Sequence, residues 1–145
     1  MDLFNAFAVD PKRLAGGVWH VFTETTDEVV EEAEIGDRVA VLIASTDNPT
    51  YRQNLQKKLR ALTIRKGSEI DVKADERITA ELVADNIILD FRNWVIQGQP
   101  IGFSREKVIE LWTDATWVLL KARLLALVGD TNAYKAIQEE AVLKN

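Results

Sequence analysis

The sequence predicts an α+β fold, in which an N-terminal antiparallel β-hairpin is followed by a predominantly α-helical bundle. Runs of β-branched and aromatic residues at 17–23 and 38–44 predict the two strands. From Asn48 onward, apolar residues recur at helical spacing between turn-forming residues, which predicts helices. Because 145 residues are about the length of one domain, we expect a single domain over residues 1–145, with the hairpin at about 17–45 and the helical part at about 48–143.

An acidic connection separates the two predicted strands. No stretch of it has the helical period that a parallel crossover needs, so we expect the strands to pair antiparallel and the connection to be mobile and solvated. Basic residues crowd the segment after the second strand. We expect the two charged stretches to neutralise each other, with a charged docking surface as the alternative. The acidic residues are Glu24, Asp27, Glu28, Glu31, Glu32, Glu34 and Asp37, and the basic residues are Arg52, Lys57, Lys58, Arg60, Arg65 and Lys66.

Two long helices are predicted in the middle of the chain. Asn48 can cap the first and Pro49 suits its first turn, while Gly67 can end it. Asp75 is the expected cap of the second, which we expect to run to about residue 95 and to stop before a turn at 97–100. The expected buried stripes are Tyr51, Leu55, Leu59 and Leu62 on the first helix, and Ile78, Leu82, Val83, Ile87, Phe91 and Trp94 on the second.

A third helix is expected after Ser104, which can cap it, with an interruption or a new cap at Asp114. The stretch 117–128 that follows is apolar around nearly the whole helical circumference, and only Lys121 and Arg123 in it are charged. One buried face does not account for this composition, so the stretch is either the central core helix or partly an interface with another chain. A last helix with Tyr134, Ile137 and Ala141 is expected after Gly129. Our hypothesis places a protein-binding surface on Trp112, Trp117, Leu120, Leu124 and Val128.

No pattern in the sequence indicates catalysis, a metal site or a cofactor. The absence of cysteine excludes disulfides, thiolate zinc sites and cysteine nucleophiles. His20 is the only histidine, and we expect a histidine in a strand to be structural. The glycines form no phosphate-binding pattern, and the carboxylates have no recognised catalytic spacing. We therefore expect a protein that binds other proteins, not an enzyme.

Charge and hydropathy also limit the classes of partner. The net charge of −5 argues against nucleic acid, for which the basic helix from Arg52 to Arg60, with Tyr51 for stacking, is the best case. No segment has the roughly 18 uninterrupted apolar residues of a membrane span, and the N-terminus lacks the basic start of a signal peptide. We expect a cytoplasmic protein with no membrane partner.

Several short signals, in order along residues 16–141, resemble those of the tail assembly chaperones of long-tailed bacteriophages and related prophages. That family's pattern is a glycine–tryptophan strand, an extended segment leading to Asn and an aromatic on a helix, an acidic–tryptophan helix end, a glycine–proline turn and a capped C-terminal helix. The chain has Asn93 where the family usually has Asp, and its acidic connection is longer. The matching residues are Gly17-Val18-Trp19, the strand at 39–44, Asn48-Pro49-Thr50-Tyr51, Asn93-Trp94, Gly98-Gln99-Pro100-Ile101 and Ser104.

The resemblance implies a non-catalytic protein that binds the tape measure protein, with the tail tube protein as a second candidate client. It implies that the client is kept soluble in the host bacterial cytoplasm until the tail tube polymerises, and that the chaperone is absent from the mature virion. The alternatives are a structural virion component, such as a tail completion or connector protein, and a nucleic-acid-binding module. Self-association into a homo-oligomer stays open.

Overall fold

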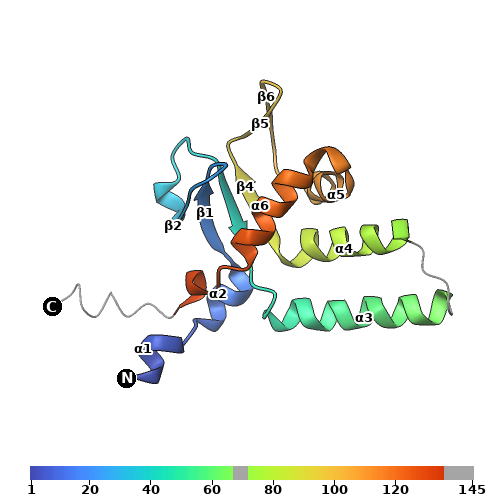
Figure 1. Ribbon diagram of the computed structural model, residues 1–145, viewed down its shortest axis with the longest axis horizontal. Coiled ribbons are helices and arrows are strands. Elements are labelled where there is room, and N and C mark those ends of the chain that lie inside the picture. The colour runs from blue at the N-terminus through green and yellow to red at the C-terminus, as the bar shows by residue number, and fades with distance from the viewer. Residues whose placement is uncertain (67–71, 136–145) are drawn as a thin grey trace.

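The computed structural model describes residues 1–66 and 72–135, and it confirms the predicted α+β class (Figure 1). In this part of the chain, a four-stranded antiparallel sheet with the order β2–β1–β3–β4 is combined with six α-helices and a separate two-stranded hairpin. The sheet strands are β1 (Val18–Phe22), β2 (Asp27–Val30), β3 (Ala40–Ile43) and β4 (Ile88–Arg92).

The predicted antiparallel pairing of the first two strands is confirmed, with Trp19 of β1 opposite Leu42 of β3. The acidic residues of the connection between them are exposed, as expected of a solvated segment, but the connection contains regular structure that was not predicted. The connection forms β2, which pairs with the other edge of β1, and a 3-10 helix, η1 (Glu32–Glu34). It is ordered because Val30 and Ile35 are buried against Trp19 on one face of the sheet.

Helix α3 (Pro49–Lys66) begins where the sequence predicts. Asn48 Oδ1 accepts a hydrogen bond from the Thr50 amide at 3.0 Å, so Asn48 caps the helix. Of its expected stripe, Tyr51 packs against the main core while Leu59 is exposed, and the side chain of Leu62 lies outside the described residues, as does Gly67. The α3 helix lies beside α4 (Val72–Asn86), and Figure 1 shows the two extending together away from the sheet.

The expected helix from Asp75 to about residue 95 is wrong at its start and in its second half. The helix begins at Val72, so Asp75 lies in its first turn and is not its cap. Helix α4 ends at Asn86, and the chain continues as β4 and then as the hairpin of β5 (Trp94–Ile96) and β6 (Gln99–Ile101). The β4 strand forms because it completes the sheet beside β3 and buries Ile88 and Phe91 in the core. The turn predicted at 97–100 is present at Gln97 and Gly98, which have the positive φ angles, 51° and 78°, of a tight hairpin turn, while residues 99 and 100 already belong to β6.

The C-terminal helices follow the predicted caps. Ser104 Oγ accepts from the Lys107 amide at 3.0 Å at the start of α5. Asp114 ends α5 and caps the next turn, because its Oδ1 accepts from the Thr116 amide at 2.9 Å. The expected last helix is a 3-10 turn up to Tyr134, and Ile137 and Ala141 lie outside the described residues. These elements are α5 (Arg105–Thr113), η2 (Ala115–Trp117), α6 (Val118–Val128) and η3 (Thr131–Tyr134).

Two short helices, α1 (Leu3–Phe7) and α2 (Pro11–Gly16), precede the sheet, so the predicted order of a hairpin followed by helices is not the order in the structure. The second of them joins the end of the described chain, because the Asp10 amide donates to the Tyr134 carbonyl at 2.8 Å. The Tyr134 hydroxyl in turn donates to the buried Ile43 carbonyl at 3.0 Å. The first and last described segments are therefore fixed to the central strands.

One face of the sheet carries the main core, which α4, α5 and α6 cover. Side chains of β1, β3 and β4 contribute Phe22, Val41, Ile43 and Phe91 to it. Trp94 is buried there as predicted, and its ring stacks on that of Phe91 with centroids 4.0 Å apart and an interplanar angle of 11°. The arrangement places α6 over the sheet with one side inward and one side outward.

Candidate protein-binding surface

The α6 helix has an apolar composition on both its inner and its outer side. Leu124 and Leu127 are 3% and 1% exposed and belong to the main core. Val118, Leu119 and Leu125 are 60%, 82% and 49% exposed on the other side. Moving large apolar side chains out of water lowers the free energy. A helix face with several exposed apolar side chains is therefore typical of a contact with another molecule.

A groove runs beside this outer side, between α6 and the turn that joins β1 to β2. It has a volume of about 630 Å³ and is called the α6 groove below. The turn has internal hydrogen bonds: the hydroxyl groups of Thr23 and Thr26 are 2.6 Å apart, and Thr23 Oγ1 accepts from the Thr26 amide at 3.0 Å. The groove is lined by Phe22, Thr23, Glu24, Leu119, Leu120, Ala122, Arg123 and Ala126.

Arg123 fixes the distance between the two walls of the α6 groove. Its Nε donates to the Thr23 carbonyl at 3.1 Å, and its Nη2 donates to the Thr26 carbonyl at 2.8 Å. The same Nη2 forms an ion pair with Asp27 at 3.0 Å. The guanidinium group is thus hydrogen-bonded to the β1–β2 turn and paired with Asp27, and the floor of the groove is apolar.

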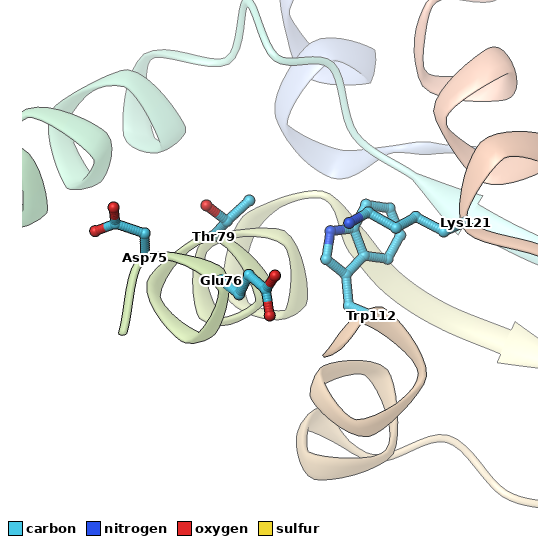
Figure 2. Close-up of a pocket in the computed structure, with 5 residues that line it drawn as sticks. All are labelled: Asp75, Glu76, Thr79, Trp112 and Lys121. Atoms are coloured by element: carbon cyan, nitrogen blue, oxygen red, sulfur yellow. The ribbon is translucent and has the colours of Figure 1, made fainter. Parts of the chain in front are cut away.

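A second, smaller hollow lies on the opposite side of α6, where Lys121 extends over Trp112 of α5. Figure 2 shows the Lys121 side chain lying over the indole ring, with Glu76 pointing towards them from α4. The Lys121 Nζ is 5.6 Å from the ring centroid, within the range of a cation–π interaction. This hollow of about 230 Å³ is called the Trp112 pocket, and it is lined by Asp75, Glu76, Thr79, Trp112 and Lys121.

The structure places the residues of the sequence-based protein-binding hypothesis mainly inside the protein. Trp112 and Leu124 are buried in the main core. Trp117, Leu120 and Val128 are half-buried and pack against that core, and of the five only Trp112 and Leu120 line a described hollow. The exposed apolar residues next to them, Val118, Leu119 and Leu125, were not singled out. They belong to the same apolar stretch, 117–128, as the predicted residues. The sequence does not show which side of this stretch faces outward, because that depends on where α6 meets the sheet.

Two observations concern the titratable groups of the described residues. His20 is fully buried on β1, and burial lowers its pKa, an effect that nearby Asp130 and Asp27 partly oppose and Arg123 reinforces. Among the described residues, no group of three or more histidine, aspartate or glutamate side chains is placed to hold a metal ion. The chemistry that the geometry supports best is binding.

No ion pair among the described residues joins the acidic connection to the basic helix, so the expectation that the two neutralise each other is not confirmed. In the part of the chain that the structure describes, four of the seven acidic residues pair with arginines outside α3, and Arg52 of α3 pairs with Asp47. The side chains of Arg65 and Lys66 lie outside the described residues. Lys58 forms an ion pair with Glu81 at 2.9 Å, and this hydrogen bond lowers the pKa of Glu81. The pairs of the acidic connection are Asp27–Arg123, Glu28–Arg38, Glu31–Arg13 and Glu32–Arg92.

Comparisons of the chain with protein-family models, with curated proteins and with solved structures find no match. Within residues 1–66 and 72–135, no helix combines the length and the apolar character that a membrane crossing requires. The surface around α6 and the resemblance of the sequence signals are therefore the observations that bear on function.

Proposed function

We propose that the protein is a non-catalytic tail assembly chaperone that binds the tape measure protein through the outer side of α6 and the α6 groove. In this proposal it keeps the client soluble in the host cytoplasm before the tail tube polymerises and is absent from the mature virion. The tail tube protein is the second candidate client. The observation that carries the proposal is the 82% exposure of Leu119 beside an apolar groove.

The shape of the surface suits a helical client. An amphipathic helix binds by laying its apolar stripe into a groove, and the stripe of one helix needs a trough with an apolar floor and small residues. The α6 groove has Leu119 and Phe22 at its sides, and Ala122 and Ala126 allow a backbone to approach closely. A long helical protein that awaits assembly exposes such stripes, so covering them would keep it soluble.

The proposal is tested by co-expression with the tape measure protein encoded in the same genome. We expect Leu119→Asp to abolish co-purification of the tape measure protein and to shift it into the insoluble fraction. Val95→Asp is the matched control, because Val95 is 60% exposed on β5, away from α6. Leu124 is unsuitable for this test because its burial makes an aspartate there disrupt the core.

Two results would contradict the proposal. One is undiminished co-purification with the Leu119→Asp variant while that variant keeps the circular dichroism spectrum of the wild type. The other is the detection of the protein by mass spectrometry in purified, washed virions, which would indicate a structural virion component.

A further inference from the structure

The α6 groove is bordered by carboxylates on its sheet side. Glu24 lines the groove from the β1–β2 turn, is exposed, and forms no ion pair among the described residues. Asp27 begins β2 opposite Phe22 and is on the same face of the sheet as the groove, whereas Glu28 is on the other face and pairs with Arg38. The cation of this side is Arg123, and its charge is already directed at Asp27 and at two carbonyls of the turn. The sheet side of the groove is therefore acidic beside an apolar floor.

The opposite side of α6 is also acidic. A hollow there is lined by Val118 of the outer side of α6 together with Glu76 and Asp114, and Asp75 joins Glu76 in the adjoining Trp112 pocket. The single cation lining these two hollows, among the residues the structure describes, is Lys121, which lies over the Trp112 ring. Carboxylates thus outnumber cations on both sides of the apolar outer side of α6.

We propose that the segment bound at α6 is a basic amphipathic helix, whose apolar stripe covers Leu119 and whose lysine or arginine side chains follow both edges of that stripe. This inference rests on the proposed function and adds the charge of the client. A cationic edge is attracted to Glu24 on one side and to Glu76 on the other, and an acidic edge is repelled at both. The same charges disfavour anionic lipid surfaces and nucleic acid, which otherwise attract apolar or basic surfaces.

The Trp112 pocket offers a specific position for one of these cations. The ammonium group of Lys121 occupies the face of the indole ring that is turned towards α6, and Trp112 is otherwise buried, so a second cation reaches this face only by displacing Lys121. A lysine or arginine of the client that reaches this position would lie between the ring and the Glu76 carboxylate. Lys121 would then compete with the client, so Lys121→Met is expected to strengthen binding of a basic segment.

The experiment uses two synthetic helical peptides of about 18 residues, which is five helical turns. Both carry the same leucine and alanine stripe, and the flanking positions are lysine in one peptide and glutamate in the other. Fluorescence anisotropy with the full-length protein is expected to give about tenfold tighter binding of the lysine peptide at low salt. Added salt should reduce the difference, because the charges at the groove edges are exposed.

Variants locate the effect. Glu24→Lys combined with Glu76→Lys should remove or reverse the preference for the lysine peptide, whereas Asp37→Lys, in the loop between η1 and β3, should leave it unchanged. Leu119→Asp should abolish binding of the lysine peptide. Equal binding of the two peptides, a preference for the glutamate peptide, or binding of neither would overturn the inference. The proposed function fails separately, when the tape measure protein co-purifies regardless of Leu119.

Discussion

Arg123 of α6 forms an ion pair with Asp27 at the first residue of β2, with 3.0 Å between Nη2 and Oδ1. The same guanidinium group donates to the carbonyls of Thr23 and Thr26. A helix near the C-terminus is thus attached to a turn about a hundred residues earlier in the chain, and the attachment forms one wall of the α6 groove. Groove shape and local stability therefore depend on the same side chain.

Replacing this arginine should lower stability and open the groove. We expect Arg123→Met, which keeps much of the aliphatic stem, to lower the free energy of unfolding by about 1 kcal/mol, since the lost contacts are partly exposed to water. Asp27→Asn removes only the ion pair and should cost less. Urea denaturation followed by circular dichroism measures both, and an Arg123→Met variant as stable as the wild type would show that the turn is held by other contacts.

Two leucines of α6 should respond differently to the same substitution. Leu124→Ala leaves a cavity in the main core and is expected to cost about 3 kcal/mol of unfolding free energy. Leu119→Ala removes a side chain that is 82% exposed and should change the unfolding free energy by less than about 0.5 kcal/mol. Equal losses in the two variants would mean that the outer side of α6 is covered in the protein alone.

Local signals in the sequence predicted the starts of α3 and α5 but not that of α4, which begins at Val72, before Asp75. Asn48 and Ser104 cap helices in the structure as expected, because a cap is decided by a side chain and an amide two or three residues away. The second half of the expected helix after Asp75 failed for the opposite reason. Ile87 and Phe91 fit a helical stripe, yet the free edge of β3, which lies far away in the chain, draws residues 88–92 into the sheet.

Strand β2 in the acidic connection was not predicted, because charged residues dominate the composition of that segment. Val30 and Ile35 supply the apolar contacts that order it, and arginines distant in sequence, such as Arg92, supply the counter-charges. The binding surface on α6 could be predicted only in part from the sequence. Composition identified 117–128 as too apolar for one buried face, but the exposure of Leu119 rather than Leu124 depends on how α6 meets the sheet.

Trp94 should contribute to stability through its indole N–H as well as its ring. Its Nε1 donates to the buried end of β3 at the Ala40 carbonyl, at 2.9 Å, while its ring stacks on Phe91. Trp94→Phe keeps an aromatic ring but removes the donor, so we expect a loss of about 1 to 2 kcal/mol in urea denaturation. Trp117→Phe is the comparison, since Trp117 is half-buried, and a larger loss there would contradict this account.

His20 is a buried group whose charge the fold disfavours. It is 0% exposed in the central strand β1, and neither ring nitrogen has a hydrogen-bond partner among the described residues. Burial lowers its pKa below the ordinary value of 6.5, although Asp130 and Asp27 oppose the shift and Arg123 adds to it. The neutral imidazole is therefore the form that the folded state accommodates.

Stability should consequently fall as the pH drops below about 6.5, where the unfolded chain binds a proton at His20 that the folded protein does not bind. The contribution is fully present above that pH, and its slope approaches about 1.4 kcal/mol per pH unit while only the unfolded state is protonated. Urea denaturation between about pH 8 and 5.5 measures it, in a window above most carboxylate titrations. His20→Leu removes the titrating group and two unpaired polar atoms, so this variant should be at least as stable at pH 8 and should lose most of the slope. A slope that is unchanged in His20→Leu would assign the pH dependence to other groups.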